Sequence, residues 1–185
     1  AIKYMEEKQR LLKEACSALK CTEKDVLKKI NEEDRKDVYK LLSYEPDTAG
    51  GIMATEFVSI RENKTIEKTL KYLQNEAPDA ESAYYLYVIN KENVLKGVVS
   101  LRDIVCNDFD TKISEITNTN VISVPYYMDQ EEVAIKFEKY GFMTMPVVDE
   151  NNKILGIVTV DDIVEVMQEE TTEDIHRLGG VDEEE

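Results

Sequence analysis

The chain has 185 residues, of which 42% are hydrophobic, so it is long enough to bury a core and too apolar to be disordered as a whole. Its formal net charge of −16 excludes the usual nucleic-acid-binding proteins, because phosphate binding requires clustered lysine and arginine. No apolar run approaches the roughly 20 residues that span a bilayer, and three cysteines without a CxxC spacing indicate free thiols in a reducing compartment.

Residues 1 to about 43 are predicted to be helical. Thr22 and Asp25 have the spacing of a capping box, and apolar residues follow them at helical spacing. Pro46 ends this stretch, because proline forces the residue before it out of helical geometry. The stretch is short for an independent core. We therefore expect residues 1–45 to be the C-terminal helices of a helical domain whose remainder precedes them.

The rest of the chain contains one unit twice. Residues 97–105 return as residues 156–164, with an offset of 59 positions. Further upstream the offset grows to 64, so that the first copy carries five extra residues, most plausibly around positions 78–82. A repeat of about 60 residues that occurs only twice predicts a pseudo-symmetric pair of small domains. Such a pair has a cleft between its halves in which a ligand can bind.

Each copy predicts the same order of elements, β-α-β-β-α. The expected strands and helices are, in the first copy, 57–60, 65–75, 84–90, 95–100 and a helix from Leu101, and in the second copy 121–124, 129–140, 145–149, 154–159 and a helix from Val160. This order predicts an α/β fold in which two helices cover one face of each sheet. The expected domains are residues 46–110 and 111–172, followed by an acidic linker at 173–185.

Negative charge is concentrated towards the C-terminal end. Residues 129–185 contain 17 aspartates and glutamates against 4 lysines and arginines. Between positions 161 and 174 there are seven carboxylates and no base, and Asp162, Glu165, Glu169 and Glu173 recur on one helix face. Like charges four residues apart destabilise a helix by a few tenths of a kcal/mol per pair. The segment is either a solvated acidic face or a site for cations.

Two signature segments indicate a family. The pattern Gly-hydrophobic-x-Ser/Thr-x-x-Asp/Asn occurs twice, first at Gly97, Ser100 and Asp103 and again at Gly156, Thr159 and Asp162. In this respect the chain resembles a tandem pair of cystathionine-β-synthase (CBS) domains. The resemblance implies the fold class α/β (α+β), with a helical N-terminal segment followed by two tandem CBS domains of order β-α-β-β-α.

Four further stretches are similar to the cytosolic region of the MgtE magnesium channel family. They are residues 44–53, 84–88, 129–134 and 173–180, of which the last lies outside the general CBS pattern. The resemblance implies a regulatory domain at the cytoplasmic face of the cell membrane, a homodimer, and a transmembrane pore domain that would follow residue 185. It also implies a Mg²⁺ sensor that closes when the ion binds at acidic interfaces and thereby shuts the pore.

Carboxylates suit Mg²⁺, which keeps several waters and takes few protein ligands. No EF-hand loop is present, so a preformed Ca²⁺ site is not expected. Under the family resemblance, the expected metal residues are Asp129, Glu131, Asp162, Glu165, Glu170, Glu173 and Asp174.

CBS pairs often bind adenosine nucleotides, and the resemblance implies an ATP site in the cleft. The expected nucleotide-binding residues are Tyr85, Ser100, Arg102, Asp103 and Phe142, with Tyr85 and Phe142 on the two sides of the base and Arg102 at a phosphate. A simpler interpretation is that Ser100 and Thr159 cap the helices that follow them, with the aspartate three residues on completing each capping box. Both interpretations are compatible with the sequence.

Three other functions are alternatives to a Mg²⁺ sensor. An enzyme is disfavoured, because no P-loop, nucleophile elbow or HExxH motif is present and the lone histidine, His176, falls near the expected end of a helix. An adenine-nucleotide-sensing CBS module of another protein would have no need for the acidic residues 169–174. A dimerising scaffold without a ligand is the third alternative.

Overall fold

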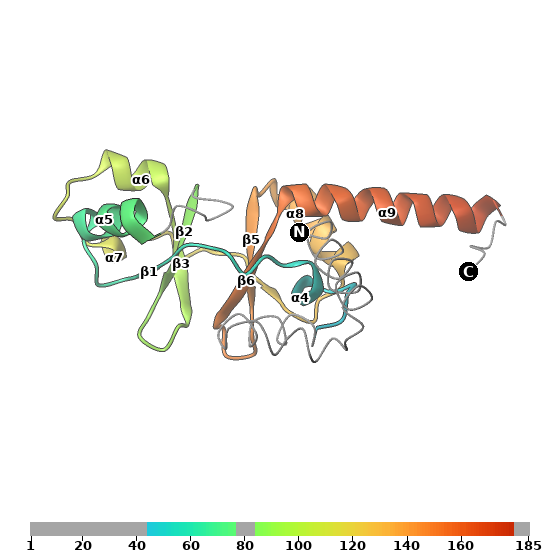
Figure 1. Ribbon diagram of the computed structural model, residues 1–185, viewed down its shortest axis with the longest axis horizontal. Helices are drawn as coiled ribbons and strands as arrows, with labels where there is room; N and C mark the ends of the chain where they lie inside the picture. Colours follow the sequence, from blue (N-terminus) through green and yellow to red (C-terminus); the bar gives the residue numbers. More distant parts are fainter. Residues whose placement is uncertain (1–43, 77–83, 180–185) are drawn as a thin grey trace, which may run out of the picture.

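The computed structural model describes residues 44–76 and 84–179 (Figure 1). The elements are α4 (Ala49–Ile52), β1 (Ser59–Arg61), α5 (Ile66–Glu76), β2 (Tyr85–Ile89), β3 (Leu95–Ser100), α6 (Leu101–Cys106), α7 (Ile113–Ile116), β4 (Val124–Pro125), α8 (Gln130–Tyr140), β5 (Thr144–Val148), β6 (Ile154–Thr159) and α9 (Val160–Gly179). The helices expected in residues 1–43 and the extra residues expected at 78–82 lie outside the described ranges.

The strands form two sheets of the same design, with orders β1-β2-β3 and β4-β5-β6. In each sheet the first strand pairs parallel to the second, and the second and third form an antiparallel hairpin. The predicted α/β class and the β-α-β-β-α order of both repeats are confirmed. The boundaries of β3 and β6 and the starts of α6 and α9 coincide with those predicted from the sequence.

The molecule is layered, with the two sheets at the centre and helices outside them. Figure 1 shows α5 and α6 on the outer side of the first sheet, and α8 and α9 on the outer side of the second. Between the sheets, buried side chains from both repeats form a shared core that includes Tyr87, Leu95, Val148 and Ile157. The expectation that two helices cover one face of each sheet is therefore confirmed, and the remaining faces cover each other.

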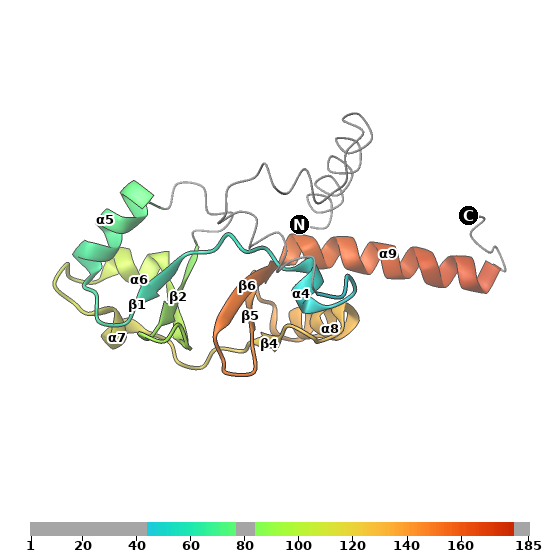
Figure 2. The same cartoon turned by 60° about the horizontal axis from the view of Figure 1, so that its bottom comes forward.

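The two repeats exchange their entering segments. Ala54 pairs with Ile157 of β6 before the chain continues into β1 of the other sheet. In the same way, Asn118 pairs with Val98 of β3 before the chain reaches β4 (Figure 2). This exchange explains why β1 and β4 begin later than predicted, since the residues just before them cross from one sheet to the other.

The short helices α4 and α7 take part in this exchange. Buried residues of α4, including Ala49 and Ile52, pack in the core of the second repeat. Ile113 of α7 is buried in the core of the first repeat. Helix α4 precedes the first repeat in the sequence but completes the core of the second repeat. Helix α7 precedes the second repeat but completes the core of the first. Within the described residues, no helix is both long enough and apolar enough to cross a membrane.

Candidate nucleotide pocket and acidic surface

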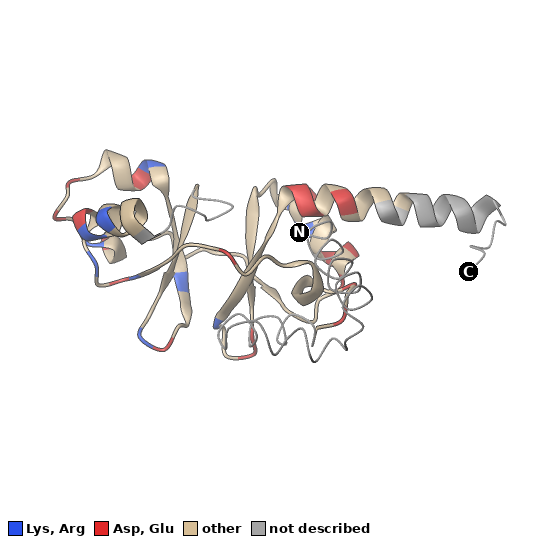
Figure 3. Cartoon of the chain, viewed as in Figure 1, with Lys and Arg blue, Asp and Glu red and all other residues tan. Residues whose placement is uncertain are grey.

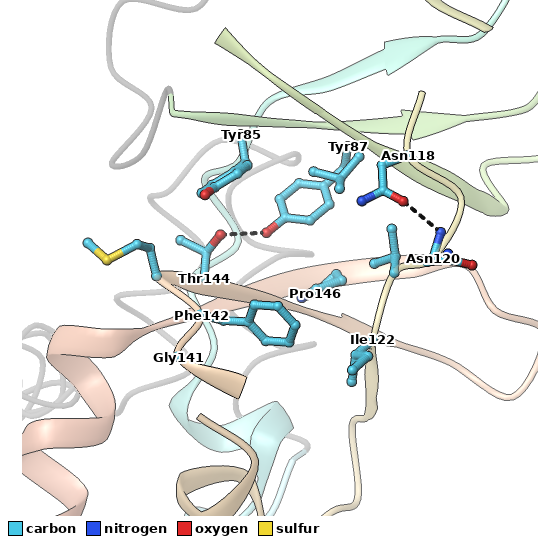
Figure 4. A pocket seen from close by; sticks show the side chains of 12 residues that line it. Tyr85, Tyr87, Asn118, Asn120, Ile122, Gly141, Phe142, Thr144 and Pro146 are labelled. Carbon is cyan, nitrogen blue, oxygen red and sulfur yellow. Dashed lines mark hydrogen bonds between the residues drawn. The ribbon is translucent and has the colours of Figure 1, made fainter. Parts of the chain in front are cut away.

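A pocket of about 240 Å³ lies between the two sheets (Figure 4). Strands β2 and β3 contribute one wall, β5 and the turn before it contribute the opposite wall, and the segment that connects the repeats closes one side. The lining residues are Tyr85, Tyr87, Val98, Asn118, Asn120, Val121, Ile122, Gly141, Phe142, Met143, Thr144 and Pro146. Aromatic rings and a few polar groups from both repeats therefore face one cavity, which is the usual character of a small-molecule site.

One hydrogen bond joins the two sheets at the pocket. The hydroxyl groups of Tyr87 on β2 and Thr144 on β5 lie 2.9 Å apart (Figure 4). Tyr87 is only 2% exposed, and its ring packs edge-on against Phe57 with 6.1 Å between the ring centroids. Burial raises the pKa of the Tyr87 hydroxyl to about 12, so this group keeps its proton at neutral pH.

Two of the five predicted nucleotide-binding residues line this pocket. They are Tyr85 and Phe142, which come from different repeats and are both half-buried. Ser100, Arg102 and Asp103 do not line it. Ser100 is nevertheless the register partner of Tyr85, so the first turn of α6, with the exposed side chain of Arg102, begins beside the pocket.

The helix caps predicted from the signature are present in both repeats. Ser100 and Asp103 form a capping box at α6, in which the Asp103 carboxylate accepts from the Ser100 hydroxyl at 2.6 Å. At α9, the carboxylate of Asp162 accepts from the Thr159 backbone nitrogen at 3.0 Å and from the Thr159 hydroxyl at 2.7 Å. The two boxes differ in environment, because Asp103 is exposed whereas Asp162 is only 3% exposed.

The predicted metal residues of α8 are at its N-terminal end. Asp129 is the N-cap, and its carboxylate accepts a hydrogen bond from the Glu131 backbone nitrogen at 2.8 Å. Asp129 also forms an isolated antiparallel β-bridge, through its backbone, with Thr48, which lies in the segment that follows residues 1–43. The exposed acidic end of α8 thus lies beside Thr48, close to the first described residues of the chain.

The other predicted metal residues belong to α9. Glu165 is half-buried, and Asp162 is buried in its capping box. Figure 3 shows acidic residues at the start of α9 and on α8, which packs against it. The helix continues as one piece to Gly179 and includes the positions of Glu170, Glu173 and Asp174, whose side chains lie outside the described ones. No three histidine, cysteine, aspartate or glutamate side chains among those described form a metal-binding group.

Sequence reasoning missed two polar features of the pocket. They are the Tyr87–Thr144 hydroxyl pair and the connecting segment, in which the Asn118 side-chain oxygen accepts from the Asn120 backbone nitrogen at 3.0 Å. Tyr87 and Thr144 are 57 residues apart, so no local pattern connects them. The internal repeat does contain a signal for Thr144. With the offset of 59 positions, Thr144 of the second repeat corresponds in sequence to Tyr85 of the first, which is predicted to bind the base.

Comparison with known proteins agrees with this architecture. The model of the CBS domain family matches residues 49–107 and 113–169. The magnesium transporter MgtE of Thermus thermophilus is 49% identical over 148 residues, which are 80% of this chain and 33% of that protein. The chain therefore spans about a third of the length of this curated relative, and the same holds for MgtE of Enterococcus faecalis.

Solved structures show the same relationship. A crystal structure of the soluble part of a magnesium transporter has 47% identity and a TM-score of 0.76, covering 80% of this chain and 58% of that chain. A crystal structure of the cytosolic domain of the Mg²⁺ channel MgtE in complex with ATP has 41% identity and a TM-score of 0.76, covering 84% of this chain and 62% of that chain. These relatives are transporters and channels rather than enzymes, as expected. The chain belongs to the CBS domain family, and the predicted resemblance to the cytosolic CBS region of MgtE magnesium transporters is confirmed.

Proposed function

We propose that this chain is the Mg²⁺-sensing regulatory region of a magnesium channel or transporter, at the cytoplasmic face of the membrane. The observation that carries the proposal is 49% identity to MgtE over 80% of the chain. In this proposal the chain acts as a homodimer and gates a transmembrane pore formed by another part of the same protein. It carries out no chemical reaction.

The position of the acidic residues supports a role at interfaces. Asp129 and Glu131 are exposed at the end of α8, beside the segment that leads back to residues 1–43. The backbone of α9 extends well beyond the second repeat (Figure 1), and its sequence after Gln168 is rich in carboxylates. Mg²⁺ usually takes one or two protein carboxylates and keeps several waters. Sites of this kind are completed by water or by a second acidic surface, rather than by a closed cage on one surface.

Gating would follow from electrostatics. Without Mg²⁺, the acidic surfaces of the CBS pair and of a second copy repel one another and separate. With Mg²⁺ bound between them, the closed arrangement is favoured by the difference in ion binding between the two states. Several weak sites together shift this equilibrium steeply with ion concentration. The residues that we propose for these sites are Asp129, Glu131, Asp162, Glu165, Glu170, Glu173 and Asp174.

Asp162 differs from the other proposed ligands. Its Oδ2 atom already accepts two hydrogen bonds from Thr159 and is buried, so any contact with Mg²⁺ would use the other carboxylate oxygen or a bridging water. Replacing Asp162 would remove a helix cap as well as a ligand. A clean test of the ion sites therefore uses exposed or half-buried carboxylates.

A titration with Mg²⁺ tests the sensor. Small-angle scattering and limited proteolysis of the chain are followed as Mg²⁺ rises, against KCl of matched ionic strength. We expect compaction and protection with Mg²⁺ alone, and a shift to higher Mg²⁺ in Glu131→Gln/Glu165→Gln. The control Glu92→Gln/Glu150→Gln removes the same charge from the exposed hairpin turns and should titrate like the unmodified chain. Identical behaviour in Mg²⁺ and KCl would contradict the sensor.

The pocket supports a second function, binding of ATP. Its aromatic walls and the similar structure solved with ATP favour an adenine nucleotide. In this arrangement Tyr85 and Phe142 hold the base, and Arg102, with Ser100 and Asp103 beside it, lies towards the phosphates. Isothermal titration calorimetry with ATP tests the assignment. Absence of binding heat for ATP and for ATP analogues would contradict it.

A further inference from the structure

The ring of Phe142 is stacked on a second aromatic ring that does not line the pocket. Tyr140 and Phe142 lie with 5.5 Å between their ring centroids and 18° between their ring planes. Phe142 lines the cavity, whereas Tyr140 is not one of the lining residues. Tyr140 therefore contacts a wall of the pocket without being part of it, and the side chain that it contacts is the one proposed to hold a base.

The turn at Gly141 brings these two rings together. Helix α8 ends at Tyr140, and Gly141 follows with a φ of 64°, in the left-handed region. The Gly141 backbone N–H donates to the Phe137 carbonyl oxygen at 2.8 Å, which closes the end of the helix. In a continuous helix, residues two positions apart do not face each other. The stack therefore depends on this helix end, and Figure 4 shows Phe142 at the cavity wall directly after Gly141.

The Tyr140 ring has a further partner at the surface. It is 43% exposed, and Lys139 Nζ lies 5.2 Å from the centroid of the ring. An ammonium group over an aromatic ring is attracted to it. The contacts with Lys139 and with Phe142 both restrict the Tyr140 side chain, although much of it faces water. Tyr140 can therefore act as a support that restricts the ring of Phe142 in turn.

Such a support affects binding because Phe142 is only half-buried at a cavity wall. A side chain in that position has neighbours on only part of its surface, and a ligand that stacks on it must fix its rotamer. Ordering one side chain on binding weakens an affinity by about 2- to 10-fold. A stack that already fixes the ring before the ligand binds removes this cost.

We infer that Tyr140 is a positioning residue for the base, which acts through Phe142 and does not touch the ligand. The inference rests on the proposed binding of an adenine nucleotide between Tyr85 and Phe142. It assigns a role in binding to an exposed tyrosine at the end of α8. Because Tyr140 orients a stacking surface and no hydrogen-bonding group, the property of the ligand that it supports is the flat face of the base.

Isothermal titration calorimetry of the whole chain with ATP tests the inference. Tyr140→Leu keeps an apolar side chain that favours a helix and removes the ring, and it should weaken ATP about 2- to 10-fold. Tyr140→Phe retains the ring and should bind ATP like the unmodified chain. The control Tyr127→Leu removes a tyrosine ring that is 63% exposed, contacts Tyr126 and does not line the pocket. It should leave the affinity for ATP unchanged.

A double-mutant cycle shows whether Tyr140 acts through Phe142. In the background of Phe142→Ala there is no ring to position, so Tyr140→Leu should cause no further loss of affinity for ATP. A purely structural role at the end of α8 would lower the affinity by the same factor in both backgrounds. Thermal unfolding without ATP identifies any variant that is not folded, and Tyr140→Met then takes the place of Tyr140→Leu in the cycle.

The outcomes separate this inference from the proposed function. An unchanged affinity in Tyr140→Leu, or equal losses in the two backgrounds, would overturn the positioning role and leave the nucleotide site in place. An equal loss in Tyr140→Phe would also overturn it, because the ring alone would not be what matters. No binding of ATP by the unmodified chain would overturn both the inference and the nucleotide site.

Discussion

Val98 and Asn118 exchange two backbone hydrogen bonds, with nitrogen–oxygen distances of 3.0 and 2.9 Å. Ala54 and Ile157 make the equivalent pair at 2.7 and 2.9 Å. These two ladders attach the segment that enters each repeat to the sheet of the other repeat. The CBS pair is therefore one interlocked unit, and the cleft between its sheets has a defined width.

The close approach at these ladders requires glycine. A Cβ atom on Gly97 would lie 2.5 Å from the Asn118 carbonyl oxygen, and one on Gly156 would lie 2.6 Å from the Ala54 carbonyl oxygen. We expect Gly97→Ala and Gly156→Ala each to lower the free energy of unfolding by about 1–3 kcal/mol, because the entering segment must move. Denaturant unfolding measures this.

Gly141 provides a contrasting control for that experiment. A Cβ atom there would meet nothing within 4 Å, but the residue ends α8 with a φ of 64°. Gly141→Ala should cost about 1 kcal/mol through backbone strain alone, and Gly141→Asn should cost less. If Gly97→Ala were no more harmful than an average surface substitution, the interlocked ladders would not be important for stability.

The buried hydroxyl of Tyr87 predicts a dependence of stability on alkaline pH. Its pKa is about 12 in the folded chain and close to 10 when unfolded, so between these values the folded state holds a proton that the unfolded state has lost. The stabilisation is complete below pH 10 and is lost as pH rises towards 12, by up to about 1.4 kcal/mol per pH unit. Unfolding of the parent chain between pH 9 and pH 11 measures the slope.

The variant Tyr87→Phe isolates this contribution from the other tyrosines. It should lower stability at pH 7 by about 1 kcal/mol through loss of the hydrogen bond to Thr144. Its stability should then fall less steeply than that of the parent chain above pH 10. Parallel curves for the two proteins would contradict the assignment of the raised pKa to Tyr87.

The two capping boxes should differ in their importance. Asp103→Ala removes an exposed cap and should cost about 1 kcal/mol. Asp162→Ala should cost more, because it leaves the Thr159 backbone nitrogen without its acceptor in a buried setting. Chemical denaturation in EDTA measures both costs without any contribution from metal ions. Equal costs would show that burial of the second box has no energetic consequence.

The aromatic walls of the pocket can be tested separately from its hydroxyl pair. Tyr85→Ala and Phe142→Ala each remove one stacking surface and should weaken ATP by roughly 5- to 100-fold, as expected for loss of base stacking. Phe109→Ala serves as the control, because its ring is 67% exposed and lies outside the pocket. Calorimetry gives the affinities, and an equal effect of all three substitutions would argue against a base in this pocket.

Much of the candidate site could be predicted from sequence patterns. The signature around Ser100 and Asp103 identified the helix caps, because capping depends on residues three positions apart. The family resemblance predicts Tyr85 and Phe142 on opposite sides of one ligand, and both line the pocket. Tyr87 could not be predicted as a pocket residue, because a tyrosine within an apolar strand has the same local pattern whether it fills a core or faces a ligand.

The sequence by itself determined the duplication, the β-α-β-β-α order, the helix caps and the concentration of carboxylates on two helices. These follow from local periodicity and from an internal repeat, which can be read along one chain. Only the tertiary structure decided that each sheet takes its entering segment from the other repeat, and that the Tyr87 and Thr144 hydroxyls meet across the cleft. Both depend on how the two sheets pack face to face, and this packing brings together residues with no fixed spacing in the sequence.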